Sequence, residues 1–432
     1  MVNQFARWTE KSMRSIWVQP KQLIQKNVRE ICEFSPFTTD DIAVVDGTAK
    51  QVKRAMSSGA KILLMGPDRF KLSVNLAPSD FKALDVDELH MCFGGAESSR
   101  SLVFEKTMQN MVESVMMTGT LVNGRLDTAF TAINAIDPRF YPLGLASFLN
   151  DHALCDGFGR PYHWHNHDKL RKILGQFGIY RTFESVFGKQ EIVMQVEWLT
   201  MNARQREAYD EFEATAILEL EQFIVDGTLP GVATIRARQI MEHPNRFPNL
   251  MDPKLPPVDI CPGEQPSKMD AIDMHFDDHY RLKTPVIVFA SMIQVQHMLV
   301  ERAKHHGLRV GALMGETSAS GRDTVDREFT SGGLNTLVCS DQIGTVGYNW
   351  QFCGDQEVDH VMNTTLGYLD SVVTQGFRRA IRQKRRSPLR VTTLAYQNSL
   401  DPKIMAIIER KSRDAHLAEP TREVLRFEGE QP

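Results

Sequence analysis

The sequence alternates short apolar segments with amphipathic ones in two separate blocks, and this alternation limits the fold more than any other feature. The apolar segments of the first block are 15–20, 42–45, 61–65, 81–86 and 114–117; those of the second are 285–290, 309–314, 334–340, 358–362 and 389–394. Segments with helical spacing, such as 22–34, 99–113 and 294–306, lie between them. Strands that alternate with helices predict parallel sheets covered by helices. The predicted fold class is therefore α/β with two parallel sheets.

Between residues 123 and 282 the alternation gives way to longer helical stretches. The clearest are 168–177, 202–223 and 232–242, and the spaced prolines of 242–266 indicate a surface loop. We expect this middle region to form helical insertions between two α/β lobes. Two such lobes facing each other would make a natural cleft for a nucleotide.

Composition sets few limits on function. The chain has 432 residues, of which 24% are charged, and a net charge of −4, so any surface for nucleic acid must be local. The six cysteines form no CxxC pair, which favours reduced thiols over disulfides or a zinc site. No apolar run approaches the ~20 residues that cross a bilayer. We expect a soluble, cytoplasmic protein, or one of the host cytoplasm if it is viral, with no membrane partner.

Asp87 and Glu88 directly follow the apolar segment 81–86. Parallel sheets bind ligands at the carboxyl ends of their strands. Adjacent carboxylates there can divide the work of nucleotide hydrolysis, one holding Mg²⁺ and the other orienting or deprotonating a water. The alternative is a solvated turn after a strand. Residues 118–120, with two threonines around a glycine, end the neighbouring segment and could contact the same ligand.

Positive charge is concentrated between residues 378 and 386. Six of these nine residues are basic: Arg378, Arg379, Arg382, Lys384, Arg385 and Arg386. The spacing of Arg379 and Arg382 predicts that both lie on one helical face, where they could neutralise a transferring phosphoryl group. A solvated basic helix and a contact to a nucleic-acid backbone are the alternatives.

The order of the segments adds further information. Residues 16–24 look like a motif Ia, Asp87 to His90 like a DExH box, and 118–120 with the helix that ends at 136–138 like a motif III. Further matches are 197–209, 237–244, 286–291 (motif IV), 340–351 (motif V) and 375–382 (motif VI). Together they resemble the superfamily-two helicase-like DNA translocase ATPases of the sucrose-nonfermenting (chromatin-remodeller) type, in a compact bacterial or viral form. The specificity lies in eight matches in the family's order.

The resemblance implies two RecA-like lobes with ATP and Mg²⁺ between them and double-stranded DNA across both. Lobe 1 would span residues 1–185, with a helical insert at about 123–185. A linking strand and a helical protrusion would occupy 186–283, and lobe 2 would occupy 284–432.

The resemblance also implies roles for individual residues. The catalytic residues would be Glu88, Gln375, Arg379 and Arg382. Nucleotide binding would involve Asp87, His90, Thr118, Gly119, Thr120, Gly344 and Gly347. The Mg²⁺ ligands would be Asp87 and Glu88, and the residues that bind DNA would be Ser340, Asn349, Lys384, Arg385 and Arg386.

The sequence departs from the family in three places. Leu121 stands where motif III usually has proline, and Arg378 where motif VI usually has glycine. No G-x-x-x-x-G-K-[ST] loop occurs, since the only Gly-Lys pair, at 188–189, continues with Gln190. We expect the chain to begin inside lobe 1 and, alone, to bind and hydrolyse ATP poorly or not at all. A separate chain could supply the loop.

The sequence therefore predicts an ATP-dependent motor on duplex DNA that lacks its own phosphate loop. An inactive nucleic-acid-binding subunit or scaffold is the alternative, and a fragment without a stable fold is a third interpretation.

Overall fold

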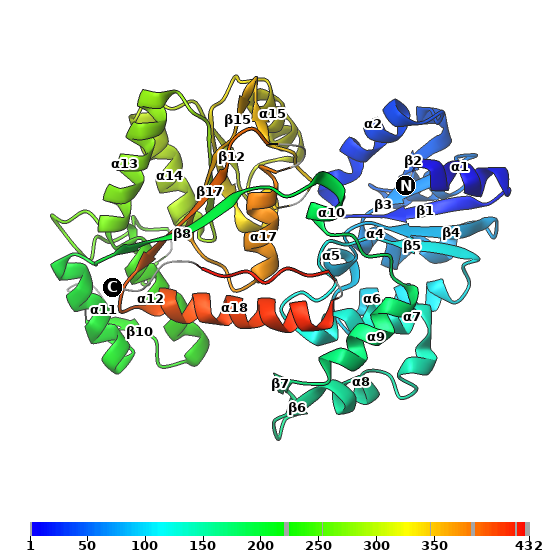
Figure 1. The fold of residues 1–432 in the computed structure, drawn as a ribbon, viewed down its shortest axis with the longest axis horizontal. Coiled ribbons are helices and arrows are strands. Elements are labelled where there is room, and N and C mark those ends of the chain that lie inside the picture. The colour runs from blue at the N-terminus through cyan, green and yellow to red at the C-terminus, as the bar shows by residue number, and fades with distance from the viewer. Residues whose placement is uncertain are drawn as a thin grey trace. The chain divides into compact units, whose positions relative to one another are not determined.

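The computed structural model describes residues 2–219, 224–252, 254–345, 347–381, 385–419 and 421–427. It divides into two compact units, each with its own sheet (Figure 1). Unit 1 comprises Met1–Tyr180 and Lys411–Glu423, and unit 2 comprises Arg181–Arg410 and Val424–Pro432. Residues 411–423, which the sequence analysis assigned to the second lobe, thus group with the first.

Unit 1 contains a parallel sheet of five strands. These are β1 (Arg14–Val18), β2 (Ile42–Val44), β3 (Ile62–Met65), β4 (Phe81–Val86) and β5 (Glu113–Met116). Their order is β2-β3-β1-β4-β5, and every neighbouring pair is parallel. The carboxyl ends of β1, β4 and β5 are in register, with Val86 paired to Val18 on one side and to Met116 on the other.

Helices cover both faces of this sheet. They are α1 (Val2–Glu10), α2 (Ile24–Phe34), α3 (Ala49–Met56), α4 (Pro67–Ser73), α5 (Leu89–Phe93) and α6 (Ser99–Met108), with 3-10 turns η1 (Lys21–Leu23), η2 (Thr39–Asp41) and η3 (Val74–Leu76). Helices α1 and α2 pack on one face through Trp8 and Ile31, and α3 to α6 pack on the other. The predicted helix 99–113 ends at Met108, because the Asn110 side chain bonds back to the Lys106 carbonyl and the chain turns into β5.

The rest of unit 1 is a mainly helical insert. Its elements are η4 (Leu126–Ala129), α7 (Phe130–Ile136), η5 (Pro138–Phe140), α8 (Leu145–His152), β6 (Ala153–Cys155), β7 (Pro161–Trp164) and α9 (His167–Phe177). Strands β6 and β7 form an antiparallel hairpin. Phe130, Phe148 and Leu170 form the core of the insert together with Ala415 and Ala418 from the far end of the chain.

Unit 2 contains a parallel sheet of six strands. These are β8 (Ile192–Leu199), β11 (Val286–Ala290), β12 (Val310–Leu313), β13 (Thr336–Ser340), β16 (His360–Thr365) and β17 (Leu389–Tyr396). Their order is β12-β13-β11-β16-β17-β8, and again all pairs are parallel. The predicted α/β class with two parallel-sheet lobes is confirmed.

Helices also cover both faces of this second sheet. They are α10 (Phe183–Phe187), α13 (Ser267–Leu282), α14 (Ile293–His305), α15 (Ala319–Thr330), α16 (Asp341–Gly344), α17 (Asp370–Arg378) and α18 (Leu400–Ala418). Helices α13 and α14 pack on one face, and α15 to α17 pack on the other with the first turns of α18. Helix α18 continues past Arg410 into residues that belong to unit 1.

The helical protrusion between β8 and α13 contains less helix than the sequence predicted. Its elements are α11 (Ala203–Thr215), β9 (Ile217–Glu219), β10 (Ile224–Asp226), α12 (Pro230–Glu242) and η6 (Pro244–Arg246); a further pair, β14 (Phe352–Cys353) and β15 (Gln356–Glu357), lies later in unit 2. The predicted helix 202–223 is wrong at residues 216–219, because Ala216 takes a left-handed conformation (φ 57°) and the chain enters β9. Residues 220–223 of this prediction lie outside the described residues. Among the described residues, no helix combines the length and hydropathy needed to cross a bilayer.

Candidate functional site

The acidic pair lies at the carboxyl end of β4, inside the sheet of unit 1. The Asp87 amide donates to the Val18 carbonyl (2.9 Å), which extends the pairing with β1 by one residue. Glu88 then takes a left-handed conformation (φ 48°) that turns the chain into α5, and its amide donates to the Asp87 carboxylate (2.9 Å). Non-glycine residues adopt this conformation rarely, mostly in turns or at functional sites. The turn holds both carboxylates at the strand end, as predicted from segment 81–86.

His90 connects the acidic pair to the loop after β5. Its Nδ1 lies 2.8 Å from the Thr118 hydroxyl and 3.5 Å from a Glu88 carboxylate oxygen. The side chain is only 5% exposed. Burial, and secondarily the positive charge of Arg422, lowers the pKa of His90 to about 4, so the imidazole is neutral at neutral pH. A neutral ring can accept a hydrogen bond from Thr118 at Nδ1.

The three residues of the predicted motif III differ in exposure. Thr118 is half-buried, Gly119 is exposed and Thr120 is fully buried. The Thr118 hydroxyl accepts the Thr120 amide (3.0 Å), and the Gly119 carbonyl accepts a hydrogen bond from Arg422 (3.1 Å). Sequence reasoning missed Arg422 because it lies about three hundred residues along the chain from the loop that it contacts.

Asp85 is a second residue that the sequence analysis missed. It points away from the core residues Leu84 and Val86, is fully buried in β4, and no side chain of the described residues bonds to its two carboxyl oxygens. Burial raises its pKa to about 7, and the nearby Asp87 charge adds to this effect, with the Val86 amide compensating in part. The sequence analysis did not identify Asp85 as buried, because the alternation of residues in segment 81–86 does not distinguish a buried carboxyl group from a solvated one.

The acidic site offers two carboxylates and no phosphate-binding loop. Asp87 and Glu88 supply carboxylate oxygens, the donors that Mg²⁺ prefers. Phosphates are usually held by successive backbone N–H groups of a glycine-rich loop and by a lysine. The sequence has no G-x-x-x-x-G-K-[ST] run, and a Cβ atom placed on Gly119 would meet nothing within 4 Å. The described residues contain no group of three or more His, Cys, Asp or Glu side chains that could hold a metal ion, and residues 87–120 do not by themselves form a cradle for phosphates.

The predicted basic face of motif VI lies only partly within the described residues. Helix α17 ends at Arg378 with Arg379 as its C-cap, and the shared helical face of Arg379 and Arg382 stays a prediction. Arg379 is 8% exposed, and its guanidinium donates to the carbonyls of Thr345 and Tyr348 in the motif V segment. Gln375 lies half-buried in α17. Arg382 and Lys384 lie outside the described residues.

The two remaining arginines of the cluster differ in environment. The Arg385 guanidinium donates to the carbonyls of Ala380 (2.6 Å), Val358 (2.8 Å) and Ser387 (3.0 Å). Burial lowers the pKa of Arg385 from its ordinary value. The Arg386 side chain is exposed, while its amide donates to Glu357. Of these two predicted DNA contacts, only Arg386 presents its charge at the surface.

The motif V residues begin at the end of β13. Ser340 is the last residue of that strand and the N-cap position of α16, and Asn349 is exposed. Gly344 packs so tightly that a Cβ atom there would lie 2.6 Å from Cβ of Cys339 and 2.7 Å from a Phe289 ring carbon. Gly347 has a φ of 76°, which favours glycine. Both glycines are therefore required by local geometry.

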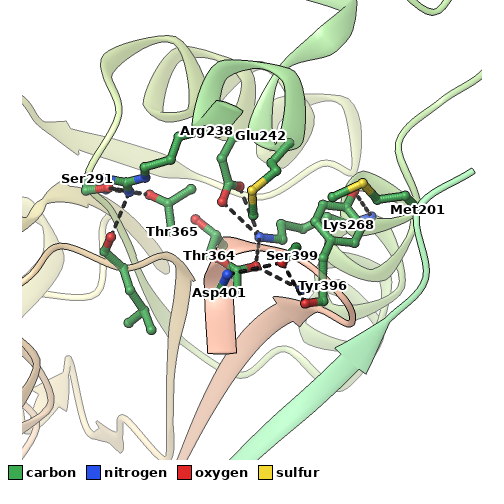
Figure 2. Close-up of polar contacts among 12 residues, drawn as sticks. Met201, Arg238, Glu242, Lys268, Ser291, Thr364, Thr365, Tyr396, Ser399 and Asp401 are labelled. Atoms are coloured by element: carbon green, nitrogen blue, oxygen red, sulfur yellow. Dashed lines mark hydrogen bonds and ion pairs between the residues drawn. The ribbon is translucent and has the colours of Figure 1, made fainter. Parts of the chain in front are cut away.

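A buried polar cluster joins the helical protrusion to the sheet of unit 2 (Figure 2). Arg238 of α12 donates to the Ser291 hydroxyl and to the Leu366 carbonyl, both at 2.7 Å, just beyond the ends of β11 and β16. Lys268 lies between two acids, with its Nζ 3.0 Å from Glu242 and 3.3 Å from Asp401. Burial by itself lowers the pKa of Lys268, but the charges of Asp401 and Glu242 together outweigh burial and raise the pKa, which keeps the buried lysine charged. The sequence analysis did not identify this cluster, because its members are spread from α12 to α18.

Comparison with known proteins leaves the family open. No protein-family model matches the chain, and no curated protein matches it. Among solved structures, a similar chain is the crystal structure of the C-terminal part of the Fun30 ATPase domain. It is 16% identical, the match covers 51% of this chain and 89% of that chain, and the TM-score is 0.39. Similarity at this level assigns neither a family nor an activity.

Proposed function

We propose that the chain acts in an ATP-dependent motor on double-stranded DNA, a translocase or helicase-like protein that hydrolyses ATP at Asp87 and Glu88. The observation that supports this proposal is the position of the acidic pair at the carboxyl end of β4, an interior strand of a parallel sheet. His90 and Thr118 from the neighbouring strand end hydrogen-bond beside it. Ligand sites of open α/β sheets form at such strand ends.

The proposed roles follow from the side chains. Asp87 and Glu88 would hold Mg²⁺, which would neutralise phosphate charge when bound, and Glu88 would also orient the attacking water. His90, fixed by Thr118, would limit the rotation of the Glu88 carboxylate. Gln375 and Arg379, both in unit 2, are also proposed to act in catalysis. For Arg379 this role would require its guanidinium to leave the carbonyls that it now contacts.

Contacts to DNA are proposed for surface residues of unit 2. Ser340, Asn349 and Arg386 combine hydroxyl, amide and guanidinium donors, which are the groups that bind phosphate oxygens. Lys384 would add a further positive charge. We propose that a separate chain supplies the loop that binds the phosphates.

The test compares two versions of the protein, the chain as it is and a version extended upstream by a strand and a G-x-x-x-x-G-K-T loop. ATP hydrolysis is measured with Mg²⁺, with and without duplex DNA. We expect DNA-stimulated hydrolysis in the extended version and a loss of at least roughly 100-fold on Glu88→Gln. Glu97→Gln, at an exposed acid nearby, is the matched control. Absence of DNA-stimulated hydrolysis in the extended version, or an unchanged rate in Glu88→Gln, would refute the motor.

A second candidate is a nucleic-acid-binding subunit or scaffold without catalysis. The observation that favours it is the absence of a G-x-x-x-x-G-K-[ST] loop from the sequence. This candidate predicts salt-sensitive duplex binding that ATP leaves unchanged and that weakens on replacing Arg386. Filter binding of the unextended chain at several salt concentrations, with and without Mg·ATP, separates the two candidates.

A further inference from the structure

A segment near the end of the chain, residues 411–423, is part of the fold of unit 1. Residues 411–423 group with this unit, although they follow it by more than two hundred residues. Ala415 and Ala418 are fully buried against the helical insert. Asp414 lies 3.5 Å from His167 at the start of α9. The end of α18 therefore has a fixed place beside the elements that follow β5.

Two charged side chains of this segment form hydrogen bonds with the backbone of the loop after β5, one near each end of the loop. The Glu419 carboxylate accepts the amide of Val122, and Arg422 donates to the carbonyl of Gly119 (3.1 Å). Both side chains are buried, with exposures of 7% and 8%. The His416 ring donates to the Arg422 carbonyl, which fixes the backbone that presents the guanidinium. Charged groups bonded to backbone in this way form the stronger class of hydrogen bonds.

The loop 118–122 is connected to the acidic site by hydrogen bonds. Thr118, one residue before Gly119, bonds His90, and His90 is beside Glu88. The backbone follows the same path, because the Leu89 amide donates to the Met117 carbonyl (3.0 Å). A displacement of residues 118–122 would therefore move the hydroxyl that orients His90 and the carbonyl on which α5 begins.

We propose that Glu419 and Arg422 are positioning residues for the acidic site, and that they act by holding the loop 118–122 so that Thr118 orients His90 beside Glu88. The effect on catalysis rests on the proposed function; the effect on the loop and on α5 does not.

The test uses the full chain with Glu419→Ala and Arg422→Met, and with the conservative changes Glu419→Gln and Arg422→Lys. Glutamine keeps an oxygen that accepts the Val122 amide, and lysine keeps one charged donor for the Gly119 carbonyl. Arg426→Met, at an exposed arginine close by, is the control. Peptide-resolved hydrogen exchange is measured over 117–123 and over 88–93, and thermal denaturation confirms that every variant is folded.

We expect exchange to rise about tenfold in both peptides for the alanine and methionine variants, with recovery in the conservative variants and no change in the control. A merely structural role would raise exchange at 117–123 and leave 88–93 unchanged, and that outcome would overturn the proposal. Unchanged exchange at 117–123 would also overturn it.

Kinetics then separate this proposal from the proposed function. In the version with the added phosphate loop, we expect kcat to fall about tenfold, because the loop acts through His90 on Glu88. If that version shows no hydrolysis at all, the proposed function fails and the exchange at 88–93 alone decides this proposal. Normal kcat together with altered exchange would refute positioning.

Discussion

Both units bury carboxylic acids close to the end of a parallel strand, but they compensate them differently. In unit 2, Glu242 and Asp401 share the buried ammonium of Lys268. In unit 1, Asp85 has no side-chain partner among the described residues, and its pKa rises to about 7. The first arrangement holds helices to a sheet. The second leaves a carboxyl near the acidic site that is easily neutralised, and it shows that a buried acid need not be a structural ion pair.

Removing Lys268 would leave the buried acids of unit 2 without a side-chain counter-charge, as Asp85 is in unit 1. Lys268→Met leaves two buried acids without a counter-charge, so we expect unit 2 to lose about 3–5 kcal/mol of unfolding free energy. Urea denaturation measures the loss, and peptide-resolved hydrogen exchange assigns it to unit 2. Lys304→Met, at an exposed lysine of α14, should change stability by less than about 0.5 kcal/mol. A Lys268 variant as stable as the control would show that the triad contributes nothing.

The reverse experiment removes the uncompensated charge of unit 1. The pKa of Asp85 is about 7 in the folded protein against an ordinary 3.8, so between these values the folded state keeps a proton that the unfolded state has released. The unfolding free energy therefore falls as pH rises through this window. Asp85→Asn cannot ionise, so we expect it to be more stable than the wild type by up to about 4 kcal/mol at pH 8, with the difference vanishing below about pH 4.

Thermal or urea denaturation of both proteins from pH 4 to pH 8 tests this expectation. Asp40→Asn, at an exposed acid of unit 1, is the control and should follow the wild-type profile. If the unfolding free energies of Asp85→Asn and wild type change in parallel with pH, the charge of Asp85 is stabilised in the folded protein. The proposed difference between the buried acids of the two units would then be wrong.

The smallest expected effect concerns two adjacent arginines of unit 2. Arg385→Ala removes donors to three carbonyls, and we expect a loss of about 1–3 kcal/mol of unfolding free energy. Its DNA affinity should keep the wild-type salt dependence. Arg386→Ala should leave stability within about 0.5 kcal/mol and reduce the slope of log K against log salt by about 1.

Salt titrations of duplex binding, together with urea denaturation of the same two variants, give both quantities. Equal slopes for the two variants would contradict the assignment of one arginine to the interior and the other to the surface.

The sequence predicted the sheets well and the ends of helices less well. Segment 81–86 became β4 at its predicted bounds, because a short apolar run next to an acidic turn suits only a buried strand. The helix expected at 202–223 stopped at Thr215, where the hairpin of β9 and β10 overrode helical spacing. Local pattern identifies an element, whereas its end depends on contacts made elsewhere.

The candidate site could be predicted only where its residues are contiguous. Asp87, Glu88 and His90 lie together in the sequence, and Thr118 follows a recognisable strand. Glu419 and Arg422 gave no signal, because their role depends on the end of α18 lying in unit 1. For Arg379 and Arg385 the sequence showed charge, but whether a guanidinium faces solvent or carbonyls is decided by packing.

The late return of the chain to unit 1 also affects how the protein is made. During synthesis the strands β1 to β5 and the insert leave the ribosome more than two hundred residues before Ala415 and Ala418. At about 5–20 residues per second this delay is roughly 10–50 s. Throughout that time the apolar face of the insert lacks its final partner. A nascent chain of this kind would depend on a chaperone, or on the sheet of unit 1 folding first, to avoid aggregation before its last helix arrives.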